Sequence, residues 1–403
     1  MVRIHAPELM KLKSRPDDFQ VEEITSVVPQ ERGELAFYRL EKKSLGTPEA
    51  IQKLCRVLRV DPRRVRYGGL KDRHAQTIQY LTIEDGPPRH YRDELLQLRY
   101  LGQVTEPYGP QSFTQNRFII TLRDIEQAAL EGILQQIAQV QDGLIANYFD
   151  DQRFGSVTTD QQFVARALID GNEELALKLA LSSYYEHDRS QERKAKAALR
   201  EKWGQWQELT RLMPDSHLKL ITQRLVHQPS DFRSAFALIP FFLRNMYLSA
   251  YQSHLWNRML AVWLESSLQP TELVNIQQKY QKLPMPGKVE KTQLEEWKSL
   301  SIPLPSSRID VSASHPAAMA IMKVLEQEKL EMRDIKLKHF REPFFSKGDR
   351  AAFYVPVDFS HEAGWDKLHK GHRKLVLKFT LPRGSYATLL VKRITTVTPF
   401  TAS

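Results

Sequence analysis

Residues 67–77 combine the residue types that a reactive site needs. Two adjacent glycines precede Asp72, with Lys71 directly before this aspartate and Arg73 directly after it. An ionised carboxylate can act as a nucleophile or a base, and neighbouring positive charge keeps it ionised in a pocket that excludes water. Taken alone, however, the same residues would more often form a salt-bridged turn, because turns combine glycine with Asp and basic residues.

The paired glycines also suit a loop that lies against a sugar-phosphate backbone, because glycine permits close approaches that a side chain would block. The segment is not a nucleotide-binding phosphate loop. The Gly-Lys-Ser or Gly-Lys-Thr ending of that motif is absent, and so is a Gly-x-Gly-x-x-Gly sequence.

Three further motifs accompany this segment along the chain. They are Lys13-x4-Asp18-Phe19-x-Val21-x-Glu23, Asn116-Arg117-Phe118 and the Asn-Tyr-Phe-Asp-Asp-Gln-Arg-Phe-Gly run of residues 147–155. Together with the Gly-Leu-Lys-Asp sequence that ends at Asp72, they resemble the TruD family of transfer-RNA pseudouridine synthases. Similarity at residues 247–253 and 381–388 extends this resemblance over nearly the whole chain.

The resemblance implies an isomerase that breaks the N1–C1′ glycosidic bond of a uridine in transfer RNA, turns the uracil and rejoins it through C5. The uridine expected from the family is uracil-13 of the D-arm, and no cofactor is expected. Asp72 aligns with the family's nucleophile, which would split one difficult displacement into easier steps. The carboxylate could add to the base or to the sugar carbon, and the sequence leaves both routes open.

The resemblance also implies roles for four residues that would surround the base. Phe118 aligns with the stacking aromatic, and stacking of this kind contributes about 1–3 kcal/mol. Asn116 could hydrogen-bond the loop or the uracil. Lys13 and Phe19 align with a motif near the active site, where a basic group could neutralise the nucleophile or a phosphate. Without the family, Phe118 would be interpreted as a core strand residue and Lys13 as a solvated surface lysine.

The net charge of the chain suits a polyanionic partner. Its 58 Lys and Arg against 48 Asp and Glu give +10. Seven of these cations fall within residues 56–74, against two aspartates. We expect the following residues to contact RNA: Arg63, Arg64, Arg66, Lys71 and Arg73. The alternative for these residues is a basic face that is only solvated. The alternative for the function is a noncatalytic RNA-binding or RNA-folding protein that uses the same cleft as the enzymes of the family.

Metal and paired-carboxylate chemistry are not expected. Cys55 is the one cysteine in the sequence, which excludes an internal disulfide framework and Cys-based zinc sites. Three of the twelve histidines are close in sequence, at His361, His369 and His372, but they lack the partners of a zinc site. The adjacent acids at 17–18 and 150–151 more often serve turns and caps than glycoside hydrolysis.

Membrane insertion is not expected either. The longest apolar stretch, residues 236–243, is far shorter than the roughly 20 residues that span a bilayer. Residues 1–19 contain no uninterrupted apolar region of a signal peptide. We therefore expect a cytoplasmic protein, and the sequence identifies no protein partner.

These motifs need a fold that mixes strands and helices. Alternating residues predict strands at residues 35–43, 79–83, 117–122, 351–357 and 375–381. Helical spacing predicts a helix that Thr47 and Pro48 open, a helix with Asp124 as its N-cap, and helices within residues 161–213, 241–266 and 317–331.

Strand-rich ends and a helical middle predict one domain that is interrupted by another. Residues 1–155 and 343–403 are expected to form a discontinuous catalytic domain, and residues 156–342 an inserted, largely helical domain. The family resemblance implies an α+β pseudouridine synthase catalytic fold, with a mixed, largely antiparallel sheet and helices, and a TRUD domain as the insert.

Overall fold

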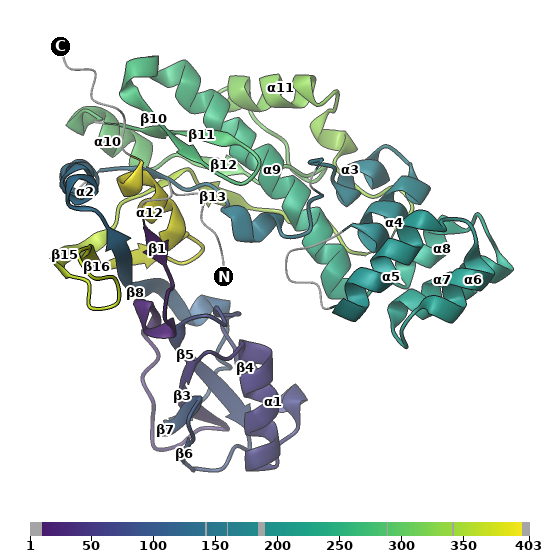
Figure 1. The fold of residues 1–403 in the computed structure, drawn as a ribbon, viewed down its shortest axis with the longest axis horizontal. Coiled ribbons are helices and arrows are strands. Elements are labelled where there is room, and N and C mark those ends of the chain that lie inside the picture. The colour runs from purple at the N-terminus through teal and green to yellow at the C-terminus, as the bar shows by residue number, and fades with distance from the viewer. Residues whose placement is uncertain are drawn as a thin grey trace.

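The two ends of the chain meet in one sheet. The computed structural model describes residues 10–141, 143–158, 160–183, 190–287, 289–340 and 342–396. The early strand β2 (Phe19–Thr25) and the late strand β16 (Arg373–Pro382) both pair with the long strand β8 (Phe113–Ile125). The two strand-rich ends of the chain therefore share a sheet (Figure 1).

The shared sheet has ten strands in the order β15-β16-β8-β2-β5-β3-β7-β6, with β1 added beside β8 and β4 beside β5. Its remaining strands are β1 (Lys11–Leu12), β3 (Leu35–Lys43), β4 (Val65–Tyr67), β5 (Gln76–Glu84), β6 (Tyr91–Arg92), β7 (Leu96–Val104) and β15 (Val357–Trp365). β2 and β5 run parallel, whereas the other pairs of described strands in this sheet run antiparallel. The predicted α+β class with a mixed, largely antiparallel sheet is confirmed.

Helix α1 (Thr47–Leu58) covers the part of the sheet formed by β3, β5 and β7. Its apolar residues recur at helical spacing, so they form one stripe that packs on the strands. Cys55 belongs to this stripe and is buried.

Helices α2 (Gln127–Val140) and α12 (Ala387–Thr395) pack against each other beside β8 and β16. The predicted N-cap of α2 at Asp124 is wrong. β8 continues to Ile125, so the helix begins after Glu126. The Asp124 carboxylate instead forms an ion pair with Lys11, at 2.7 Å.

The middle of the chain is largely helical, as predicted. Its helices are α3 (Val164–Ile169), α4 (Glu173–Ser182), α5 (Ser190–Glu201), α6 (Trp206–Leu212), α7 (His217–His227), α8 (Phe232–Ala237), α9 (Phe241–Ser267), α10 (Lys291–Lys298) and α11 (Ala318–Gln327). Short two-stranded sheets join β10 (Leu273–Gln277) to β11 (Lys282–Pro286), β12 (Ser301–Pro303) to β13 (Asp349–Ala351) and β9 (Ile145–Ala146) to β14 (Phe353–Tyr354). No helix within the described ranges is both long and apolar enough to cross a membrane.

Helix α9 runs from the helices α3 to α8 toward β10 and β11 (Figure 1), and its side chains belong to two apolar cores. Tyr247 near its beginning packs with α3 to α8 in a core of their own. From Leu248 onward its buried residues join the core that also contains β8, β16 and α12. The domain boundaries after residues 155 and 342 stay a prediction.

Candidate active site

Asp72 lies in the wall of a cavity of about 300 Å³. The loop of residues 68–75, strands β2 and β8 and the segment before α12 contribute to this wall, hereafter the Asp72 cavity. Five of the residues predicted from the sequence line it: Phe19, Lys71, Asp72, Asn116 and Phe118. The sheet explains this convergence, because β2 and β8 are neighbouring strands and bring their two motifs together.

The cation that holds the Asp72 carboxylate is Lys13. The Lys13 ammonium lies 2.7 Å from Asp72 Oδ2, and only 9% of the Lys13 side chain is exposed, against 33% for Asp72. Gln152 Nε2 donates to Asp72 Oδ1 at 3.3 Å. The Lys13 Nζ also lies 4.0 Å from the centre of the Phe19 ring. Lys13 is therefore a buried partner of the aspartate and not a solvated surface lysine.

A buried lysine fixes the backbone of the loop that carries Asp72. Lys42 on β3 donates to the carbonyl oxygens of Asp72 at 3.0 Å, Lys71 at 3.3 Å and Leu45 at 2.7 Å. Burial lowers the pKa of Lys42 to about 8, and the attraction of Asp72 opposes this shift in part. The position of Asp72 thus depends on a cation beneath the loop as well as on the one beside its carboxylate.

The paired glycines meet two local requirements of this loop, while their approach to a sugar-phosphate backbone stays a prediction. A Cβ atom on Gly68 would lie 2.5 Å from the Phe113 ring, so only glycine fits against this side chain. The close approach at Gly68 is therefore to a protein ring. Gly69 has a φ of 155°, a backbone conformation that other residues rarely adopt.

Lys71 turns away from Asp72 into an internal network. Its ammonium forms an ion pair with Glu23 at 2.9 Å and donates to Asn116 Oδ1 at 3.1 Å. Glu23 is buried and also accepts a hydrogen bond from Tyr108. The network fixes the Asn116 side chain at the cavity wall and occupies the lysine that was expected to contact RNA.

Phe118 is both a core residue and a cavity residue. It is 7% exposed and stacks on Phe379, with ring centres 5.6 Å apart. Phe19 meets it edge-on at 6.2 Å. The core packing and the cavity position are compatible, because the ring packs on neighbouring rings while it also lines the Asp72 cavity.

The run of residues 147–155 connects the cavity to the rest of the fold. Asn147 accepts hydrogen bonds from Arg350 at 2.8 Å, and Gln152 reaches Asp72. Asp150 and Asp151 both accept from the Lys392 ammonium, at 2.6 and 2.7 Å. These adjacent acids thus form an ion cluster with Lys392, and this structural role explains why two acids stand next to each other here.

The predicted RNA-binding arginines lie outside the residues that line the Asp72 cavity. They are held by local partners on the surface near β4 and α1: Arg63 by Asp61, Arg64 by Asp85, Arg66 by backbone carbonyls and Arg73 by Glu49. Their contact with RNA stays a prediction.

Sequence reasoning missed several cavity residues. Gln152 and Arg153 stand in the motif that was recognised, but nothing in the sequence singled them out. Arg350, Ser385 and Tyr386 also line the cavity. The motif at residues 381–388 was the available signal for two of these, and Arg350 had none.

We found no group of three or more potential metal ligands among His, Cys, Asp and Glu in the described part of the chain. Two of the three histidines considered for zinc instead face carboxylates. His369 Nδ1 lies 2.8 Å from Asp366, and His372 Nδ1 lies 2.8 Å from Asp124.

Comparison with known proteins identifies the family. The model of the family described as tRNA pseudouridine synthase D (TruD) matches residues 6–394. The tRNA pseudouridine synthase D of Aquifex aeolicus is 28% identical over 400 residues, which cover 96% of this chain and 98% of that protein. The protein of the same name from Leptospira interrogans is 27% identical over 401 residues, with 95% of each chain covered.

The fold agrees with this match. The crystal structure of a Methanosarcina mazei protein assigned as a candidate TruD superposes with a TM-score of 0.71 at 25% identity, covering 97% of this chain and 94% of that one. Because the family model spans nearly the whole sequence, the chain belongs to the TruD family of tRNA pseudouridine synthases, which are isomerases.

Proposed function

We propose that the chain converts a uridine of transfer RNA to pseudouridine with Asp72 as the nucleophile, and that the uridine is uracil-13 of the D-arm. One observation carries this proposal. A partly exposed carboxylate, paired with a buried lysine, opens into a cavity that is lined by Phe19 and Phe118. A positioned anion beside aromatic side chains is what attack on a nucleoside requires.

The reaction is an isomerisation, so its atoms balance without a co-substrate. The N1–C1′ bond breaks with its electron pair remaining on uracil, the detached base turns, and C5 forms the new bond to C1′. The proton on C5 is then lost to a base, and N1 gains one. Asp72 can add either to the base or to C1′ in the first step, and both routes use the same carboxylate.

The surrounding residues would divide the remaining tasks. Lys13 and Gln152 hold the two carboxylate oxygens in place. Phe118 would stack on the flipped base, and Asn116, fixed by Lys71, would hydrogen-bond its edge. Such a clamp keeps the free uracil from leaving while it turns.

Conversion of a defined RNA tests the proposal. The purified full chain is incubated, with no added metal or nucleotide, with a transfer-RNA transcript that carries uridine-13 and with a matched transcript that carries cytidine-13. We expect one pseudouridine, at position 13, in the first RNA and none in the second. Binding without any pseudouridine would support a noncatalytic RNA-binding protein. Pseudouridine at another position would reject uracil-13 as the target but would leave the proposed activity in place.

A further inference from the structure

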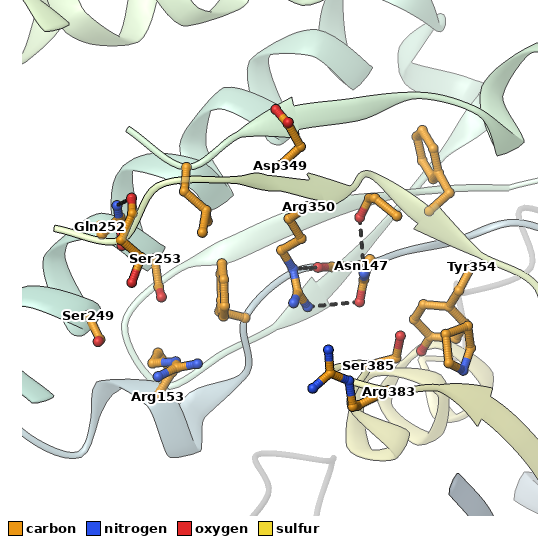
Figure 2. A pocket seen from close by; sticks show the side chains of 16 residues that line it. Asn147, Arg153, Ser249, Gln252, Ser253, Asp349, Arg350, Tyr354, Arg383 and Ser385 are labelled. Atoms are coloured by element: carbon orange, nitrogen blue, oxygen red, sulfur yellow. Dashed lines mark hydrogen bonds between the residues drawn. The ribbon is translucent and has the colours of Figure 1, made fainter. Parts of the chain in front are cut away.

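A second cavity of about 360 Å³, shown in Figure 2, has lining residues in common with the Asp72 cavity. The two cavities share three lining residues: Arg153, Arg350 and Ser385. We call these residues the shared wall. A ligand that occupies both cavities can therefore contact the shared wall.

The second cavity has an excess of positive charge. Arg153, Arg350 and Arg383 reach it from three separate segments of the chain, against one acid, Asp349. In Figure 2 the Asp349 carboxylate points away from the Arg350 guanidinium. Within the described residues, the hydrogen-bond acceptors of Arg350 are all neutral oxygens, from Asn147, Tyr148 and Gly384. Burial lowers the pKa of Arg350 to about 10, which still leaves it a cation at neutral pH.

Two polar atoms of the shared wall are buried without a hydrogen-bond partner. They are Arg153 Nε and Ser385 Oγ, neither of which has a partner within the described part of the protein. A buried polar group without a partner destabilises a fold, so such atoms are uncommon and call for an explanation. Here both atoms can donate and both belong to the shared wall, so a small shift of each side chain toward an acceptor bound there would satisfy them.

The shared wall is rigidly held. The Phe149 ring lies against both guanidinium groups, with its centre 4.1 Å from Arg350 Cζ and 5.2 Å from Arg153 Cζ. Arg350 also donates to the carbonyl of Gly384, next to Ser385, at 3.1 Å. Gly384 has a φ of 86°, which favours glycine and fixes the turn that presents the serine. The donors are therefore positioned before any ligand arrives.

We propose that the shared wall binds the phosphodiester that joins the reacting uridine to one neighbouring nucleotide, and that the second cavity receives this neighbour. The inference rests on the proposed function, because it places the uridine in the Asp72 cavity. A phosphodiester offers two charged oxygens to guanidinium and hydroxyl donors. It is also the group that stands between two nucleosides in RNA, as the shared wall stands between two cavities.

A binding experiment tests the phosphate contact without requiring turnover. The full chain carrying Asp72→Asn is titrated with the transfer RNA in which one phosphate is a neutral methylphosphonate, on the 5′ or the 3′ side of the target uridine or at a remote position. We expect one of the two flanking changes to weaken binding about tenfold and the remote change to have little effect. In the double variant Asp72→Asn, Arg153→Gln, the same flanking methylphosphonate should weaken binding little further, because the arginine that contacts the phosphate is already lost.

Variant controls separate this role from a structural one. Arg333→Gln removes an exposed arginine that lines neither cavity and should leave the tenfold penalty intact. Ser385→Ala should weaken RNA binding a few-fold while the Tm of the free protein stays constant or rises, because an unpartnered buried hydroxyl is removed. An Arg153→Gln variant that keeps the full penalty, or flanking changes without effect, would overturn the phosphate site.

The neighbour in the second cavity has its own test. An abasic residue on the side identified by the phosphate experiment should weaken binding several-fold, and affinity equal to that of the intact RNA would reject the nucleotide in this cavity. Turnover by the Asp72→Asn variant would instead refute the proposed nucleophile, and the binding comparison would still stand.

Discussion

Two carboxylate–lysine sites in this molecule have similar chemistry and opposite surroundings. Lys392 lies between Asp150 and Asp151, and the side chains of Lys392 and Asp150 are 3% and 4% exposed. Thr388 donates a further hydrogen bond to Asp150. Asp72 has a single lysine on one oxygen, a longer contact from Gln152 on the other, and a third of its side chain open to a cavity.

The difference indicates which carboxylate can react. In the closed cluster of Lys392, Asp150 and Asp151, the ammonium and the Asp150 carboxylate are buried, and the attraction of both acids raises the pKa of Lys392 although burial alone would lower it. Such a cluster holds parts of the fold together but presents no free oxygen to a ligand. The second site, the open pair of Asp72 and Lys13, keeps its carboxylate positioned and accessible, which is what a nucleophile needs.

Removing the lysine of the closed cluster should have the largest effect on stability. Lys392→Met leaves the buried Asp150 and the partly exposed Asp151 without a cation, and we expect the free energy of unfolding to fall by about 3–5 kcal/mol in urea titrations. Lys298→Met, which removes an exposed partner of Glu295, serves as the control and should cost about 1 kcal/mol or less. A loss for Lys392→Met no larger than that control would contradict the comparison.

Lys42 predicts a dependence of stability on pH. The unfolded chain keeps this proton up to about pH 10.5, whereas the folded chain releases it at about pH 8. Because the unfolded state then binds more protons between these values, unfolding free energy should rise with pH across this window, by up to about 3 kcal/mol. Urea titrations at pH 7 and pH 9.5 would measure the rise, and Lys42→Met should lack this contribution. An equal rise in the variant would assign it to other groups.

The open pair should respond in activity more than in stability. Lys13→Met removes the cation beside Asp72, and we expect kcat for pseudouridine formation to fall about 10²-fold, as for other lost electrostatic partners in active sites. The Tm should change less than in Lys392→Met, since Asp72 can still contact water. A normal kcat for this variant would show that the reaction does not need the Lys13 cation.

The surface arginines should produce the smallest effect. Arg66 is exposed and donates only to backbone carbonyls among the described residues, whereas Arg64 has Asp85 as a partner. We therefore expect Arg66→Gln to reduce the slope of log affinity against log salt by up to about 1, and Arg64→Gln to reduce it less. Equal salt slopes for both variants and the wild type would show that these two arginines do not contact the RNA.

Local pattern was sufficient for much of the fold. Alternation located β3, β5, β8 and β16, four of the ten strands described in the sheet, and Pro48 with the apolar spacing after it located α1. The N-cap at Asp124 failed because pairing with β16 keeps β8 extended to Ile125, which local sequence cannot reveal. Strands and helices are thus predictable where neighbours along the chain decide them.

The site was predictable only where a motif recorded it. Family motifs indicated Asp72, Phe118 and Lys13, but the contact between Lys13 and Asp72 joins residues 59 positions apart. Arg350 reaches its partner Asn147 across 203 positions and belongs to no recognised motif. Tertiary packing alone creates such contacts, so neither spacing nor residue type could indicate the shared wall.

The same substitution in both sites gives the most direct test of the central claim, that the open carboxylate is the one that reacts. Asp72→Asn and Asp150→Asn are compared in single-turnover formation of pseudouridine, together with Tm and RNA affinity. The account predicts that Asp72→Asn folds with a normal Tm, binds RNA within a few-fold of the wild type and forms no pseudouridine, whereas Asp150→Asn loses stability first. Pseudouridine formation by Asp72→Asn at the wild-type rate would contradict it.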